Sequence, residues 1–236
     1  MSQILLIFRI IYSESQKWGG CIMKLKSLTA ILATALMVVC LAGCTGSGNA
    51  GGASSDSDTR LVAEAAVAYG MKEKDFNDVM DLMTKYENEG SAYYVSKNVN
   101  DAQGIFLQLA TIGKELSANV TEVTVAAANE NLGTGNFETY AVQFTFTDAD
   151  SAKKYYDYEA FYFQDLGGEV TTGEKDGFTY TLSYFEGSVL VAREGQYLKG
   201  NTVIFISANT TVDYSGDCFA TVVFDDIGVV DPAVLK

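Results

Sequence analysis

Carboxylates, tyrosines and cysteines are the side chains of this chain that could carry chemistry, because the sequence contains no histidine. It has 30 acidic residues, 14 tyrosines and 4 cysteines among 236 residues. Without histidine there is no Ser-His-Asp or Cys-His catalysis, no histidine general base and no histidine ligand for zinc. Phosphate-binding glycine loops, Cys-x-x-Cys pairs and nucleophile elbows are also missing. The sequence therefore indicates no catalytic residue and no cofactor, and it favours a protein that is not an enzyme.

A pair of carboxylates is the route to catalysis that the composition leaves open. Glycoside hydrolysis needs two acids about 5–10 Å apart in a cleft. The chain has many acids, and no pattern singles out a pair. A carboxylate-based hydrolase of cell-envelope glycans is therefore the alternative to a binding module, and a cleft with paired acids would distinguish the two.

Tyrosines crowd the segment 155–163 and form a candidate ligand surface. They are Tyr155, Tyr156, Tyr158 and Tyr162. On one helix these rings cannot all face a single core, so we expect some to be exposed. Exposed aromatic rings bind sugar faces or quaternary amines. The alternative, which the sequence favours, is a large core helix whose hydroxyls reach water.

Acidic residues at 148 and 150 resemble the start of a calcium-binding loop. That loop then requires an oxygen ligand and a glycine, where this chain has Ala152 and Lys153. Capping of the following helix explains both Asp148 and Asp150. We predict no metal site.

A basic start and an apolar run precede Cys44. Residues 23–26 read Met-Lys-Leu-Lys, and residues 28–41 are apolar apart from two threonines. This is the layout of a secretory signal peptide. The run is shorter than the roughly 20 residues that a bilayer core requires, so we predict cleavage rather than a membrane span. The residues at its end are Leu41, Ala42, Gly43 and Cys44.

The segment 23–44 resembles the signal peptide and lipobox of bacterial lipoproteins. In that family the thiol of the lipobox cysteine receives a diacylglyceryl group, and cleavage makes this cysteine the N-terminus. The resemblance implies that Cys44 is acylated, with fatty acids such as palmitate, and that the membrane is a partner of the protein. At about 0.8 kcal/mol per buried methylene, two acyl chains make a durable anchor. It also implies a location on the extracytoplasmic face of the cell membrane.

The chain divides into four segments. Residues 1–22 precede the basic start of the signal peptide, so we expect translation to begin at Met23; the alternative is a long N-terminal region of the signal. Residues 23–43 form the signal peptide. Residues 44–58, rich in Gly, Ser and Asp, are expected to be a flexible tether. Residues 59–236 form a single acidic domain.

The net charge of the chain restricts the classes of molecule that it is expected to bind. The formal net charge is −14 at pH 7, and removal of residues 1–43 takes away more basic than acidic residues. Nucleic-acid binding requires a basic surface, so we expect none. An envelope protein, a glycan or a cationic partner is compatible with this charge, and so is an acidic surface that only keeps the protein soluble.

Apolar patterns predict an α+β domain. Two N-terminal helices precede a ferredoxin-like β-α-β-β-α-β unit over residues 92–184. An antiparallel meander follows, in which 219–224 is the last strand. Strict alternation over residues 140–146 predicts a strand with one face in a core and one in water. Further strands are expected at 188–192 and 202–207, with loops at 195–201 and 209–217.

The function that the sequence favours is a membrane-tethered, extracytoplasmic binding or interaction module without catalysis. Histidine and catalytic motifs are missing, and the expected tether follows the cysteine whose acylation the resemblance implies. The fold class carries no function by itself.

Overall fold

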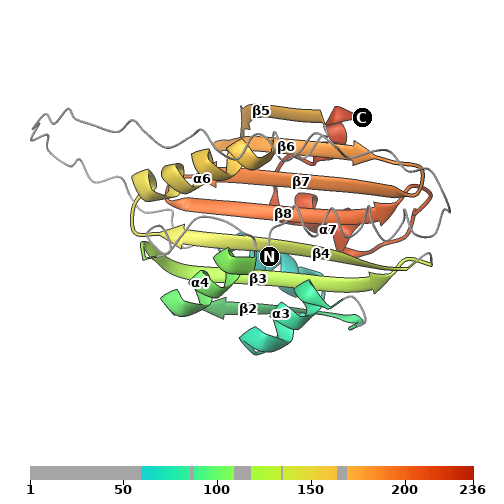
Figure 1. Ribbon diagram of the computed structural model, residues 1–236, viewed down its shortest axis with the longest axis horizontal. Helices are drawn as coiled ribbons and strands as arrows, with labels where there is room; N and C mark the ends of the chain where they lie inside the picture. The colour runs from blue at the N-terminus through green and yellow to red at the C-terminus, as the bar shows by residue number, and fades with distance from the viewer. Residues whose placement is uncertain (1–59, 86–87, 109–117, 134, 164–168) are drawn as a thin grey trace, which may run out of the picture. The chain divides into compact units, whose positions relative to one another are not determined.

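The structure is a computed structural model that describes residues 60–85, 88–108, 118–133, 135–163 and 169–236 (Figure 1). The predicted extension, signal peptide, lipobox and tether at residues 1–58 lie outside the described residues. Within the described residues, no helix is both long enough and apolar enough to cross a membrane.

The described part of the chain is an α+β domain built on an eight-stranded sheet. The helices are α2 (Leu61–Ala68), α3 (Phe76–Thr84), α4 (Val99–Gln108), α6 (Ala149–Phe163), α7 (Phe219–Ile227) and the 3-10 helix η2 (Pro232–Leu235). The strands are β1 (Lys72–Glu73), β2 (Gly90–Ser96), β3 (Val120–Asn131), β4 (Asn136–Phe146), β5 (Glu169–Lys175), β6 (Phe178–Glu186), β7 (Leu190–Lys199) and β8 (Thr202–Thr211).

The strand order is β1-β2-β3-β4-β8-β7-β6-β5. β1 and β2 pair in parallel, and every other neighbouring pair is antiparallel. β4 pairs with β8 in the middle of the sheet, with Val142 opposite Phe205. The hairpin β3–β4 and the meander β5–β8 therefore meet along one central ladder.

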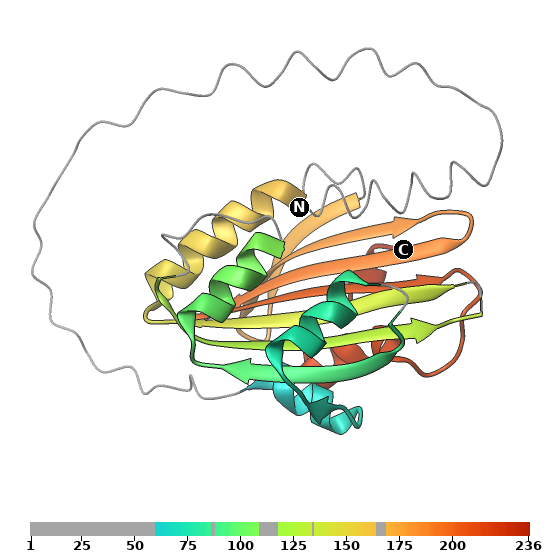
Figure 2. The ribbon, with the colours of Figure 1, turned by 60° about the horizontal axis from the view of Figure 1, so that its bottom comes forward.

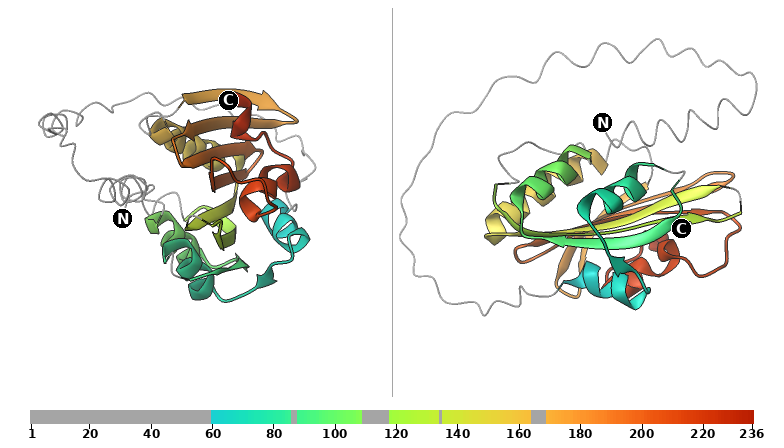
Figure 3. Two further views of the ribbon diagram at one scale, coloured as in Figure 1. Left: turned by 90° about the vertical axis from the view of Figure 1, so that its right-hand side faces the viewer. Right: turned by 90° about the horizontal axis from the view of Figure 1, so that it is seen from below.

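Helices cover both faces of the sheet (Figures 2 and 3). α3, α4 and α6 lie on one face, which we call the α6 face. α2 and α7 lie on the other, the α7 face. Each face has its own apolar core: Val142, Phe144 and Tyr155 belong to the core of the α6 face, while Leu182 and Phe219 belong to that of the α7 face.

The prediction that one face of β4 lies in water is wrong, because helices cover both faces of the sheet. Tyr140 and Phe144 point to the α6 face, as expected for the apolar side of this strand. The polar side is buried as well, because α2 packs over it: Gln143 is buried and its Oε1 accepts the backbone N–H of Val62 at 3.2 Å. β4 is thus a central strand without a solvent face.

The strand order also corrects the expected ferredoxin-like unit. In that unit the second helix would carry the chain to a strand beside the first strand. Here β2 pairs with β3, and α6 leads instead to β5 at the far edge of the sheet. The local elements β2, α4, β3, β4, α6 and β6 are present as predicted, but their pairing is different.

The predicted C-terminal meander differs from the structure in three further places. Residues 219–224, expected as a strand, form most of α7, which ends at Gly228 in a left-handed conformation (φ 79°). A short apolar run does not distinguish a buried strand from a buried helix. Residues 195–199, expected in a loop, belong to β7. The strand β8 likewise extends to Thr211, into the segment expected to be a polar loop.

Gly195 in β7 provides room for the side chain of Tyr197, and this predicts a measurable cost. A Cβ atom at position 195 would collide with the Tyr197 ring. That ring is held because its hydroxyl donates to the carbonyl of Val230 at 2.5 Å. We expect Gly195→Ala to lower the free energy of unfolding by about 1–3 kcal/mol, the usual cost of overpacking. Urea unfolding measures it; in Gly195→Ala/Tyr197→Leu the two losses should not add.

Candidate functional site

Polar side chains on the α6 face form the candidate site. We call them the polar floor: Asn129, Glu138, Glu194, Gln196 and Ser207. The alternation of each strand places them there, since Glu138 precedes Tyr140 by two positions and Gln196 precedes Leu198 by two. The registers bring them together, because Asn129 lies opposite Glu138 and Ser207 lies opposite Glu194.

The polar floor contains side-chain atoms that are shielded from solvent and lack a hydrogen-bond partner in the structure. They are Asn129 Oδ1, Glu138 Oε1, Glu194 Oε2 and both amide atoms of Gln196. Gln196 is 0% exposed and Glu138 is 9% exposed. A buried polar group left unpaired costs about 1–3 kcal/mol, so folded proteins rarely leave one. Three more such atoms lie on the α7 face, on Thr124, Thr139 and Arg193, but the polar floor gathers five and includes both carboxyls. We therefore take the polar floor as the place where a ligand could satisfy them.

Few contacts hold the polar floor from within. The Ser207 hydroxyl lies 3.5 Å from Glu194 Oε1, a long hydrogen bond. The amide nitrogen of Asn129 donates to the carbonyl of Lys85 at 3.2 Å, which ties this side chain to the end of α3. The side chain of Asn209 donates to the carbonyl of Glu138 at 3.1 Å and leaves the Glu138 carboxyl free. The two carboxyls therefore keep most of their bonding capacity.

Both carboxyls of the polar floor have raised pKa values. Burial raises the pKa of Glu138 to about 7 from the ordinary value of 4.5. Burial also raises the pKa of Glu194 to about 7, with the hydrogen bond to Ser207 acting in the opposite direction. Desolvation disfavours the charged form of a carboxyl, and a nearby cation would reverse this effect. Among the described residues, neither carboxyl takes part in an ion pair.

Arg193, which precedes Glu194 in the sequence, makes its contacts on the opposite face of the sheet. Arg193 points to the α7 face, where its Nη1 donates to Asp231 Oδ2 at 2.6 Å. Its Nη2 donates to the carbonyl of Ala220, and its guanidinium carbon lies 5.4 Å from the centre of the Phe224 ring. Arg193 therefore fastens α7 and the C-terminal segment to the sheet and does not neutralise the polar floor.

The predicted tyrosine surface on α6 is largely a core element. Tyr155 is 1% exposed and meets the Phe144 ring edge-on at 5.4 Å. Tyr156 is 5% exposed, and its hydroxyl lies 2.9 Å from that of Thr181. These two rings cannot form an exposed ligand surface, since they fill the space between α6 and the sheet. Tyr158 is 37% exposed, and the side chain of Tyr162 lies outside the described residues.

Asp148, the first of the two acids considered for calcium binding, caps α6. Asp148 Oδ1 accepts the backbone N–H of Ser151 at 2.7 Å, which lowers the pKa of Asp148. Asp150 lies in the first turn of α6. In the part of the chain that the structure describes, no three Cys, Asp or Glu side chains are arranged to hold a metal ion.

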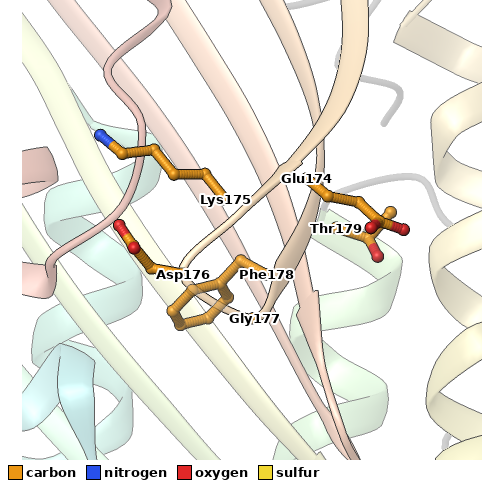
Figure 4. Close-up of a pocket in the computed structure, with 6 residues that line it drawn as sticks. All are labelled: Glu174, Lys175, Asp176, Gly177, Phe178 and Thr179. Atoms are coloured by element: carbon orange, nitrogen blue, oxygen red, sulfur yellow. The ribbon is translucent and has the colours of Figure 1, made fainter.

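Two open depressions lie elsewhere on the described surface. One, of about 390 Å³, is at the turn between β5 and β6, where the side chains of Glu174 and Lys175 point to opposite sides (Figure 4). The other, of about 300 Å³, is lined by Arg60, Glu73 and Tyr93 near the edge of the sheet. Neither is lined by residues of the polar floor, and in the first the charged side chains do not converge. The polar floor remains the stronger candidate.

Comparisons with known proteins give no family. No protein-family profile matches the sequence, and no curated protein matches it. Among solved structures, the extracellular domain of PknH from Mycobacterium tuberculosis is similar at 14% identity, over 70% of this chain and 94% of that chain, with a TM-score of 0.36. Similarity at this level carries no argument about function.

Sequence patterns missed the polar floor, although one signal was present. Glu138 stands in phase with the apolar side of β4, two positions before Tyr140, so a carboxyl occupies a core-facing position. Glu194 and Gln196 were hidden because Gly195 made their segment resemble a loop. An acid in phase with apolar residues is the pattern that could have indicated the site.

Proposed function

We propose that this protein is a lipid-anchored, extracytoplasmic binding module that holds a polar ligand on the polar floor. The observation that supports the site is the set of buried, unpartnered polar atoms on one face of the sheet. Support for the anchor comes from the lipobox at Leu41, Ala42, Gly43 and Cys44. The tether at residues 44–58 would hold the domain beside the membrane, where it meets ligands of the envelope.

A ligand screen tests the binding role. The full chain, solubilised in detergent at pH 8, would be screened by thermal unfolding against amines, amino acids, sugars and peptidoglycan fragments. We expect at least one class to raise the melting temperature, because a ligand that binds only the folded state stabilises it. Gln196→Leu should abolish that shift, while Lys153→Gln on the exposed side of α6 should keep it. A panel without any shift, or a shift that Gln196→Leu leaves intact, contradicts the proposal.

Membrane attachment gives a separate prediction. We expect Cys44→Ala to abolish incorporation of radiolabelled palmitate, because the thiol that receives the lipid is gone. Cys218→Ala is the matched control and should keep the label, since Cys218 is buried at the start of α7. Labelling of Cys44→Ala at the level of the unmodified chain would disprove the anchor.

A carboxylate-based glycan hydrolase is the second candidate, and the raised pKa values of Glu138 and Glu194 are the observation in its favour. A general acid needs such a raised value. The strand β8 lies between the two residues, and their positions are offset by two, so their Cα atoms lie about 12 Å apart at ordinary strand spacing. The side chains can bring the carboxyls to the separation that glycoside hydrolysis needs. The observation against an enzyme is that acid and nucleophile need different pKa values, whereas both are raised alike. Turnover of cell-wall glycans, lost in Glu138→Gln and in Glu194→Gln, would favour the enzyme.

A further inference from the structure

We propose that the polar floor recognises an organic cation whose ammonium groups pair with Glu138 and Glu194. This inference rests on the proposed binding function and names the chemical class of its ligand. It starts from two carboxyls on one sheet face and from an independent feature beside them, a fully buried glutamine whose amide has no partner.

Among the described residues, no basic side chain pairs with the two carboxyls of the polar floor. The basic residues on elements that pack near it are already engaged or point away. Lys85, after α3, pairs with Asp81 at 2.7 Å, and Lys153 on α6 pairs with Asp157 at 2.6 Å. Lys154 is exposed on α6, and Arg193 pairs with Asp231 across the sheet. A ligand that enters the polar floor therefore meets two acids whose charge the described residues do not compensate.

An organic cation fits these acids better than a metal ion does. A calcium ion takes six to eight oxygen ligands within about 2.6 Å, and the described residues offer no cluster of three acidic or thiol ligands. Glu138 and Glu194 stand on strands separated by β8. An ammonium group donates several N–H bonds to one carboxyl, and the hydrocarbon chain of a diamine or polyamine can place one ammonium group at each of two separated carboxyls. This hydrocarbon chain would lie against Tyr140 and Phe205, whose rings stack at 5.9 Å on the same face.

Gln196 can bond a second polar group of the ligand, in addition to the charge that the two carboxyls bind. Its amide can donate and accept at once, and neither function is used within the structure. It follows Glu194 by two positions on β7, so both side chains point to the same face. Once buried, an amide that is built to bond a ligand rejects molecules that leave it unpaired. The ligand should therefore carry a second polar group near its ammonium.

Protonation makes this recognition depend on pH. The carboxyl pKa values near 7 mean that the polar floor is mainly neutral at pH 5.5 and mainly anionic at pH 8. A bound cation favours the anionic form. Affinity for an ammonium should therefore rise with pH, whereas affinity for a neutral sugar or diol should not.

The experiment uses calorimetric titration of the full chain in detergent at pH 8 and pH 5.5. The cationic probes are putrescine, spermidine and trilysine; the others are 1,4-butanediol, glucose, succinate and calcium chloride. We expect at least one cationic probe to bind with one-to-one stoichiometry, and at least tenfold more weakly at pH 5.5. Glu138→Gln/Glu194→Gln should weaken binding at least tenfold. Asp225→Asn/Asp226→Asn removes the same charge from the exposed side of α7 and should leave the affinity unchanged.

Each contrary outcome has a defined meaning. Equal weakening in both double variants shows attraction to an acidic surface and overturns the site. Binding of 1,4-butanediol or glucose that Gln196→Leu abolishes overturns the ammonium class but leaves the proposed binding function standing. Binding of calcium alone replaces the ammonium with a metal. Failure of every probe, together with an empty ligand screen, overturns both the ammonium class and the binding function.

Discussion

Raising the pH from 5 to 8 should lower the free energy of unfolding by about 3 kcal/mol for each of Glu138 and Glu194. Their pKa values in the folded protein are about 7, against an ordinary 4.5. The folded state therefore binds these protons more tightly than the unfolded state does. Stability from this source is fully present below pH 4.5 and is lost as the pH rises through 7, at about 1.4 kcal/mol per pKa unit.

Few other side chains contribute to the pH dependence of stability between pH 5 and pH 8, so the effect of the two glutamates can be measured. No histidine is present to titrate between pH 5 and pH 8. Acids with lowered pKa, such as Asp148 and Glu186, act in the other direction, but only at pH values below their ordinary range. Between pH 5 and 8 they stay ionised in both states.

Urea unfolding of the full chain and of the two glutamine variants measures the effect. At pH 8, Glu138→Gln and Glu194→Gln should each be more stable than the unmodified chain by about 3 kcal/mol, because a neutral amide has no ionisation to lose. At pH 5 the three proteins should agree within about 1 kcal/mol. A glutamine variant that is less stable at pH 8 would show that its carboxylate has a favourable partner in the fold.

Replacing Arg193 should lower the free energy of unfolding, by about as much as the glutamine variants raise it at pH 8. Its guanidinium is nearly buried. It donates hydrogen bonds to Asp231 and to the carbonyl of Ala220, and it lies over the ring of Phe224. Removing one partner of a buried ion pair usually costs about 3–5 kcal/mol, because the other charge stays behind. We expect Arg193→Met to fall in this range, and to free the C-terminal helix η2, whose first residues follow Asp231.

Chemical unfolding with a matched control tests this prediction. Lys153→Met breaks an exposed ion pair with Asp157 on α6 and should change stability by less than about 1 kcal/mol. Arg193→Met/Asp231→Asn should recover part of the loss, since it removes the stranded charge. A loss below about 1 kcal/mol for Arg193→Met would mean that the contacts of this guanidinium contribute little to holding the C-terminal segment.

The sequence was sufficient for elements with local patterns. Alternation marked β4 and β6, helical spacing marked α3, and Asp148 marked the start of α6. The order of strands was not available from such patterns, because pairing of β4 with β8 joins segments far apart in the chain. The helix α7 was mistaken for a strand, since its run from Phe219 to Phe224 is buried in either form.

The site was less accessible to sequence reasoning than the fold. The tyrosines at 155 and 156 were candidates for a ligand surface, but the core helix that the sequence favoured is confirmed for both, since helix phase turns them into the core. The polar floor depends on residues from β3, β4, β7 and β8 that only the sheet brings together. Glu138 alone broke a local rule, as an acid on the apolar side of its strand. Such local conflicts are where functional residues are expected.

The measurement that tests the central claim most directly is an NMR titration of the glutamate carboxyl carbons in the full chain. We expect two glutamates with midpoints near pH 7, which disappear one at a time in Glu138→Gln and Glu194→Gln. Addition of the ammonium ligand should lower both midpoints. If every glutamate instead titrates near the ordinary 4.5, the two carboxyls are solvated or already paired, and the polar floor is not a site that awaits a ligand.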